Sequence, residues 1–140
     1  MTGLFRRAAG LADLQNALLD PLVKREGLTH ASFQLLATVR AGGRISQAEA
    51  ARILGLSAAT VSEAAADLAA KGCLARERSD EDRRLQVLRV TPATDEVLDR
   101  IARDLKKIEE RVLEGLDPAA LRQACETLDR VIERMAEREL

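Results

Sequence analysis

Residues 45–91 read ISQAEAARILGLSAATVSEAAADLAAKGCLARERSDEDRRLQVLRVT, and the order of signals in this stretch decides the fold. Ser46 and Glu49 have the spacing of a capping box, which starts a helix because each side chain can satisfy a backbone amide of the other residue. Gly55 supplies the left-handed residue that ends this short helix in a tight turn. Ser57 then caps a second helix. The stretch therefore predicts two short helices joined by a tight turn.

The second helix should continue from Ser57 to Lys71, with Gly72 as its C-terminal stop. The two helices should share an apolar inward face made of Ala50, Ile53, Leu54, Leu56, Val61, Ala65, Leu68 and Ala69. The outward N-terminal end of the second helix carries Ser57, Ala58, Ala59, Thr60, Ser62 and Glu63. Small residues let a helix sit deep in a DNA groove, and hydroxyls can meet phosphates or base edges. Taken alone, the pair could also be a corner in a helical bundle.

A charged β-hairpin follows the helices. Residues 74–78 and 85–90 are predicted to be strands, joined by a turn over residues 79–82. Asp82 is placed to hold Arg84 by a salt bridge, so that the guanidinium projects from the hairpin tip. Arginine suits a narrow minor groove, where negative potential is concentrated. A solvated charged turn is the alternative, but helix-turn-helix plus hairpin is typical of a DNA-docking unit with a wing.

Amphipathic helices flank this unit on both sides. The first should span residues 4–24, and Pro21 should bend it or end it early. Thr29 is a good cap for the next helix, and after the hairpin a cap residue precedes both Pro92 and Pro118, each at the start of a helix. The predicted fold class is mostly α, a winged helix-turn-helix with long N- and C-terminal dimerisation helices.

The predicted organisation has three parts within one intertwined domain. Residues 1–26 form an N-terminal dimerisation helix, residues 27–91 form the winged helix-turn-helix DNA-binding unit, and residues 92–140 form the C-terminal dimerisation helices. Long terminal helices around a small central unit favour an intertwined homodimer. An intramolecular bundle is the alternative, but it would leave the first helix with little to pack against.

The net charge gives no support of its own to a nucleic-acid partner. The chain has 140 residues, with 22 Lys and Arg against 23 Asp and Glu and a formal net charge of −1. The distribution is more informative, because residues 92–140 carry nine basic and thirteen acidic side chains while residues 44–91 carry eight and seven. Four arginines crowd together in the central part and could attract phosphate: Arg76, Arg78, Arg83 and Arg84.

Several functional classes find no support in the sequence. One histidine, no phosphate-cradling glycine loop and no nucleophile beside a base argue against an enzyme, and no cofactor is expected. Cys73 and Cys125 lie far apart without a CxxC motif, so we expect no metal site and two buried structural thiols. No signal peptide or membrane-spanning run is recognisable, which predicts a cytoplasmic protein.

Five short strings resemble one family. They are Gly-Leu-Thr at 27–29, Leu-Ser-Ala-Ala-Thr-Val-Ser at 56–62, Gly-Cys-Leu-Ala-Arg at 72–76, Asp-Arg-Arg at 82–84 and Leu-Arg-Val-Thr-Pro at 88–92. In order and spacing the chain resembles the MarR family of bacterial winged-helix transcriptional regulators over nearly its whole length. The Asp-x-Arg string followed by a strand ending in Thr-Pro is the most specific part of the resemblance.

The resemblance implies a homodimer that binds a pseudo-palindromic operator in double-stranded DNA, favours a repressor, and allows release by a small-molecule effector. It places Arg84 in the minor groove with Asp82 as its orienting partner. The other implied DNA contacts are Arg76, Arg78 and Arg83 near phosphates, and Ser57, Ala59, Thr60 and Ser62 facing the major groove.

Three features depart from the family pattern. Glu63 stands where a basic or neutral residue is common, which weakens phosphate attraction but could accept a hydrogen bond from cytosine N4. Thr94 replaces a frequent glycine and is expected to alter only the start of its helix. Aromatic residues are nearly absent, although effector pockets in this family are often aromatic-lined, and Phe33 is expected in the core. A winged-helix protein-interaction module without DNA binding is the alternative function.

Overall fold

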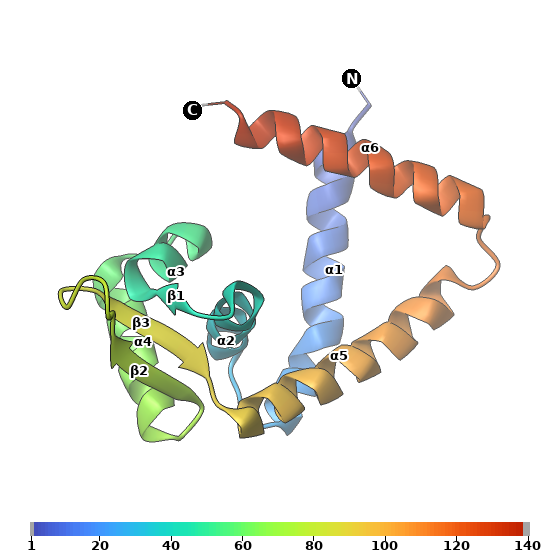
Figure 1. Cartoon of the computed structure of the whole chain (residues 1–140). Coiled ribbons are helices and arrows are strands. Elements are labelled where there is room, and N and C mark those ends of the chain that lie inside the picture. Colours follow the sequence, from blue (N-terminus) through green and yellow to red (C-terminus); the bar gives the residue numbers. More distant parts are fainter. Residues whose placement is uncertain (1, 139–140) are drawn as a thin grey trace. The chain divides into compact units, whose positions relative to one another are not determined.

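The computed structural model describes residues 2–138 (Figure 1). Its elements are α1 (Leu4–Arg25), α2 (His30–Gly42), β1 (Ile45–Ser46), α3 (Gln47–Leu54), α4 (Ala58–Ala70), β2 (Leu74–Arg78), β3 (Gln86–Val90), α5 (Pro92–Leu113) and α6 (Pro118–Ala136). The predicted fold class, mostly helical with a winged helix-turn-helix, is confirmed. The chain divides into two compact units, one ending at Leu105 and one beginning at Lys106. The predicted division by role into residues 1–26, 27–91 and 92–140 stays a prediction.

Helices α3 and α4 form the helix-turn-helix, and their ends follow the predicted caps. The Ser46 hydroxyl accepts a hydrogen bond from the Glu49 amide at 3.0 Å, and the Ser57 hydroxyl accepts one at 3.1 Å from the amide three residues further on. Gly55, with φ of 65°, closes the turn between the helices. The second half of the capping box is replaced by an ion pair, because the Glu49 carboxylate binds Arg52.

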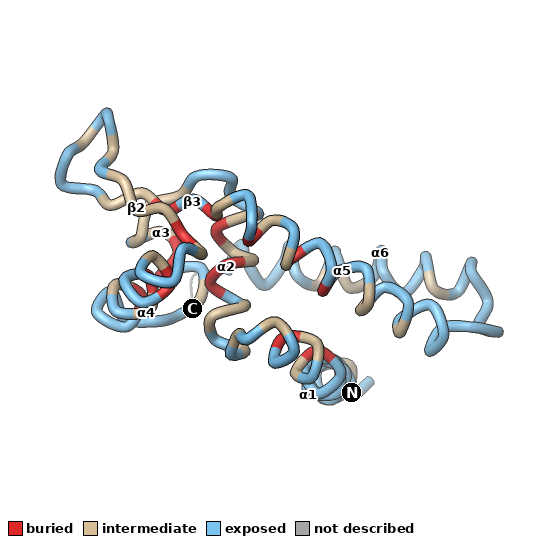
Figure 2. Tube along the Cα trace, turned by 90° about the horizontal axis from the view of Figure 1, so that it is seen from below, coloured by how far each residue is buried: buried red, intermediate tan, exposed pale blue. Residues whose placement is uncertain are grey.

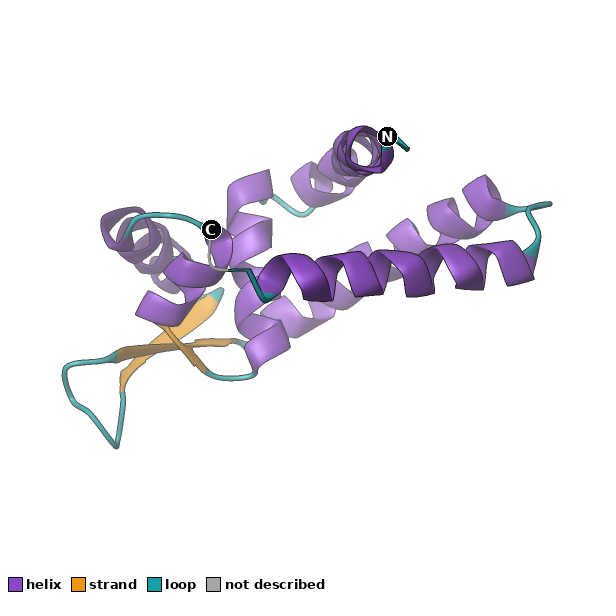
Figure 3. Ribbon diagram, turned by 90° about the horizontal axis from the view of Figure 1, so that it is seen from above, coloured by secondary structure: helices purple, strands orange, loops and turns teal. Residues whose placement is uncertain are grey.

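The three strands form an antiparallel sheet in the order β1-β3-β2. Strands β2 and β3 pair along their full length, with Leu74 opposite Val90 and Arg78 opposite Gln86. The loop between them projects beyond the sheet as the wing (Figure 3). Sequence reasoning missed β1, because its two residues are too few to show an alternating pattern.

The core of the winged-helix unit lies between α2, α3, α4, the inner face of the sheet and the start of α5 (Figure 2). Its buried residues are Leu35, Leu36, Val39, Ala50, Ala51, Val61, Ala65, Leu68, Leu74, Leu88, Val90 and Leu98. Two residues predicted for this core lie outside it, since Ile53 is 53% and Leu56 is 46% exposed. On the eight-residue α3 the inward face is instead made by Ala50 and Ala51, and the chain turns Leu56 outward after Gly55.

Two threonines at the start of α5 form hydrogen bonds with the turn before β2. The Thr91 hydroxyl donates to the Gly72 carbonyl at 2.9 Å, and the Thr94 hydroxyl donates to the Cys73 carbonyl at 2.9 Å. Thr94 is buried. We expected Thr94 to alter only the start of α5, but its hydroxyl also joins α5 to the turn between α4 and β2.

Helix α1 packs on α5 through a second cluster, made of Leu19, Val23 and Ile101. The sequence predicts that Pro21 bends α1 or ends it early. Pro21 lies inside the helix, which continues to Arg25, so it does not end the helix, and a bend at this position stays a prediction. The proline ring removes one backbone donor. The buried side chains of Leu19 and Val23 on either side fix the turn against α5.

Ion pairs reinforce the packing of α5 in this first unit. The Glu26 carboxylate accepts two hydrogen bonds from the Arg100 guanidinium, both at 3.0 Å, and its side chain is only 15% exposed. Arg100 holds the pKa of Glu26 below its ordinary value. Two further pairs connect α5 with α1 and with α2: Arg25–Asp104 and Arg40–Asp99.

The second unit contains the end of α5 and all of α6. The Asp117 carboxylate caps α6 by accepting a hydrogen bond from the Ala119 amide at 3.1 Å, as predicted. Helix α6 has no buried residue between Pro118 and Ala136. Cys125 on its apolar stripe is exposed, so the prediction that both cysteines are buried is wrong, and Cys73 is only half-buried.

No single helix within residues 2–138 combines the length and the apolar composition of a membrane span; α3 and α4 reach that composition only when joined across their 116° bend.

Candidate nucleic-acid interface

The N-terminal end of α4 presents the predicted recognition residues. Ser57, Ala59, Thr60 and Glu63 are exposed, and Ser62 is half-buried. The hydroxyls of Ser57 and Thr60 lie 2.8 Å apart and share a hydrogen bond, so part of their bonding capacity is used inside the cap. This arrangement fixes the first turn of α4, and the side chains on its outward surface are mostly short.

The wing places one arginine at its tip, held by one carboxylate. The Asp82 carboxylate accepts hydrogen bonds from the Arg84 amide at 3.0 Å and from the Arg84 guanidinium at 3.2 and 3.4 Å. The backbone amide, followed by the guanidinium, lowers the pKa of Asp82 below its ordinary value. The Arg84 side chain is nevertheless 91% exposed. The predicted salt bridge is therefore present, and it orients the cation without covering it.

Hydrogen bonds within the wing loop fix its backbone. The Arg78 guanidinium donates to the Arg83 carbonyl at 3.0 Å, and the Ser79 hydroxyl accepts from the amides of Glu81 and Asp82 at 3.2 and 3.4 Å. Within residues 2–138 the Arg83 side chain has no hydrogen-bond or ion-pair partner, and it is exposed. Of the two arginines predicted near phosphates here, Arg78 therefore stabilises the loop and Arg83 is available to a ligand.

Arg76 lies differently from the other predicted arginines. It belongs to the inner face of β2, opposite Leu88 on β3, and its guanidinium donates to the Gln47 side-chain oxygen at 3.1 Å. Its Nε is buried without a partner in the described part of the chain. The side chain connects the wing with the start of α3, and a phosphate contact by Arg76 stays a prediction.

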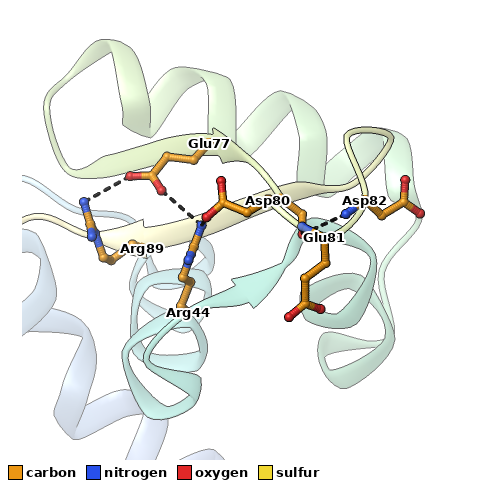
Figure 4. A network of polar contacts seen from close by, with 7 residues as sticks. Arg44, Glu77, Asp80, Glu81, Asp82 and Arg89 are labelled. Atoms are coloured by element: carbon orange, nitrogen blue, oxygen red, sulfur yellow. Dashed lines mark hydrogen bonds and ion pairs between the residues drawn. The ribbon is translucent and has the colours of Figure 1, made fainter.

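A polar network on the outer face of the sheet was not predicted from the sequence. Glu77 on β2 binds Arg89 on β3 at 3.1 Å and Arg44, next to β1, at 3.4 Å (Figure 4). The carboxylate thus links all three strands at the base of the wing. The alternation of β2 and β3 could have paired Glu77 with Arg89, but Arg44 gave no signal because β1 was not recognised.

A cavity of about 470 Å³ opens beside this network, between the end of α2, the sheet and the start of α5. Its lining includes Arg40, Arg89, Thr91 and Asp95. Both arginines already have carboxylate partners, Asp99 and Glu77. Within residues 2–138 no group of three His, Cys, Asp or Glu side chains could hold a metal ion.

Comparison with known sequences finds one family match, over the winged-helix unit up to the loop before β3. Residues 26–85 match the pattern of the MarR family, a segment that runs from the end of α1 to the tip of the wing. No curated protein matches the chain.

Solved structures share the fold over nearly the whole chain. A MarR family transcriptional regulator from Silicibacter pomeroyi is 20% identical, covers 96% of this chain and 91% of its own, and superposes with a TM-score of 0.82. A transcriptional regulator from Thermotoga maritima is 21% identical over 99% of this chain and 100% of its own, with a TM-score of 0.78. A mutant of MarR from E. coli complexed with operator DNA is 18% identical over 93% of this chain and 94% of its own, with a TM-score of 0.73. At these identities the likeness shows a common fold, and the sequence match to the MarR family is confined to residues 26–85.

Proposed function

We propose that this chain is a transcriptional regulator that binds double-stranded DNA as a homodimer. Helix α4 would enter the major groove, and the wing would place Arg84 in the neighbouring minor groove. The observation that carries the proposal is the pair of hydrogen bonds from the Arg84 guanidinium to the Asp82 carboxylate. They orient an almost fully exposed cation at the end of a fixed loop. A solvated surface turn does not require an oriented arginine. A side chain that enters a narrow groove binds more tightly when it is oriented beforehand.

Two further observations support the proposal. The match to the MarR family covers residues 26–85, which include α4, Asp82 and Arg84, and a mutant of MarR from E. coli with the same fold is complexed with operator DNA. Helix α1 and helix α6 each carry exposed apolar side chains that a second copy could cover. A twofold dimer would bind two half-sites about one helical turn apart.

Substitution of Arg84 tests the proposal. Arg84→Ala should weaken binding to a selected operator about tenfold and reduce the slope of log affinity against log salt by about one. Arg84→Lys is the matched control, because it keeps the charge and the salt slope but lacks the planar fork that fits a narrow groove. Equal operator affinities for the wild type and Arg84→Ala would remove the wing arginine from the mechanism.

Selection of bound sequences from a random DNA pool separates this function from its alternative. Enrichment of a pseudo-palindrome supports the regulator. If no duplex is retained at low salt, the chain is a winged-helix interaction module instead. Repression and release by a small-molecule effector rest on the family resemblance. A promoter–reporter assay tests repression, and a thermal-shift screen of phenolic compounds tests effector binding.

A further inference from the structure

The outward surface of α4 lacks the side chains that usually read purines. Arginine or lysine binds guanine O6 and N7, and asparagine or glutamine binds adenine N6 and N7. The sequence of α4, AATVSEAAADLAA, contains none of these four residues. Its exposed residues are Ala58, Ala59, Thr60, Glu63, Ala66, Asp67 and Ala70. Base reading by this helix must therefore rely on its two carboxylates, a hydroxyl and methyl groups.

Glu63 is the carboxylate on this surface that nothing within residues 2–138 neutralises. By contrast, Asp67 on the same helix pairs with Lys71 at 3.0 Å, and Glu49 on α3 pairs with Arg52 at 2.6 Å. The helical neighbours of Glu63, three and four residues away, are Ala59, Thr60, Ala66 and Asp67, and none of them is a cation. A free carboxylate facing a groove lined by phosphates costs affinity unless it accepts hydrogen bonds there.

The major groove offers few donors to such a carboxylate. Guanine and thymine present the acceptors O6, N7 and O4, which repel it, and adenine places the acceptor N7 beside its N6 amino group. Cytosine presents the N4 amino group alone, and it is the base that Glu and Asp side chains contact. An exposed glutamate on a recognition helix therefore discriminates for a C·G pair.

We propose that Glu63 is the specificity-determining residue of the helix and reads the N4 amino group of a cytosine in each half-site. Ala59 and Ala66 lie about 6 Å and 4.5 Å from it along the helix axis, roughly one or two base-pair steps, and their methyl groups contact thymine methyls beside the cytosine. The DNA bound by α4 is thus a half-site with cytosine flanked by thymine on the strand that the helix faces. This inference rests on the proposed DNA-binding function.

The experiment compares the wild type with Glu63→Ala on three duplexes. These are the operator selected from the random pool, the same operator with its central C·G pairs changed to T·A, and a duplex of unrelated sequence. For the wild type the C·G to T·A change should cost about tenfold in affinity. For Glu63→Ala the change should cost less than about twofold, while affinity for the unrelated duplex should rise because one negative charge has been removed.

Glu81→Ala is the matched control. Glu81 is an exposed carboxylate in the wing loop, so its removal also raises affinity for unrelated DNA, but the preference for C·G should remain. Thermal melting should be the same for all three proteins, because neither glutamate side chain is packed in the core.

The outcomes separate the inference from the function on which it rests. If Glu63→Ala keeps the full preference for C·G, or if the selected half-site contains no cytosine at a fixed position, Glu63 does not read the base although the protein binds DNA. If the wild type binds none of the three duplexes, the DNA-binding function fails together with the inference.

Discussion

At the scale of single residues, the ion pair at the wing tip was predictable, because both partners lie in one turn. Asp82 and Arg84 are two positions apart, so local geometry decides whether they meet, and the structure places them as expected. The burial of Cys125 and Leu56 depends on which elements pack over them. Cysteine and leucine are usually buried, but residue type alone does not determine which elements pack over them, and both residues are exposed.

The role of Asp82 leads to a prediction about orientation rather than charge. The pKa of Asp82 lies below its ordinary value, so the carboxylate is ionised and holds Arg84 at neutral pH, and the hold is lost as the pH falls through that lowered pKa. Asp82→Asn keeps the size of the side chain but loses the carboxylate that orients the Arg84 guanidinium. We therefore expect several-fold weaker operator binding at pH 7, measured by fluorescence anisotropy. Glu81→Gln removes the same charge nearby and should bind as well as the wild type or better. If the two variants behave alike, Asp82 acts only through its charge.

At the scale of elements, local signals predicted the starts of helices well. The caps at Ser46, Ser57 and Asp117 all bind the backbone amides expected of them. Elements that depend on distant partners were missed, above all β1, which exists because Ile45 and Ser46 pair with β3 some forty residues later. The contact of Arg44 with Glu77 follows from that pairing and could not be predicted without it, whereas the Glu77–Arg89 pair lies within the predicted hairpin.

The attachment of α5 to the end of α1 gives a prediction about pH. Because Arg100 lowers the pKa of Glu26 in the folded chain, their pair contributes stability above the ordinary value of 4.5 and loses it as the pH falls through the lowered pKa. Glu26→Gln should therefore lower the melting temperature at pH 6 and make it less dependent on pH between 6 and 3. Arg100→Gln and the double variant complete a double-mutant cycle, in which the two effects should not add. Parallel melting curves for Glu26→Gln and the wild type across this range would show that the pair contributes nothing.

At the scale of the whole molecule, the terminal helices α1 and α6 each leave apolar side chains exposed. Phe5, Leu11 and Leu14 on α1 are each more than 60% exposed, and so is Ile132 on α6. Sequence reasoning derived a dimer from the length and periodicity of the terminal helices. The structure adds that α6 buries no residue of its own, although its apolar positions recur at helical spacing.

A helix with one apolar face and no buried side chain needs a partner surface, and in a homodimer the second copy provides it. Ile132→Glu would place a carboxylate on that face, and burying an unpaired charge is costly, so the dimer dissociation constant should rise at least about tenfold. Gln123→Glu adds the same charge on the opposite side of α6, nine residues away, and should leave the dimer intact. Sedimentation equilibrium measures both constants.

The operator affinity of Ile132→Glu should fall along with its self-association, because a monomer contacts only one half-site at a time. A dimer of Ile132→Glu as stable as that of Gln123→Glu would exclude this face of α6 from the interface and leave α1 as the surface through which two copies could associate.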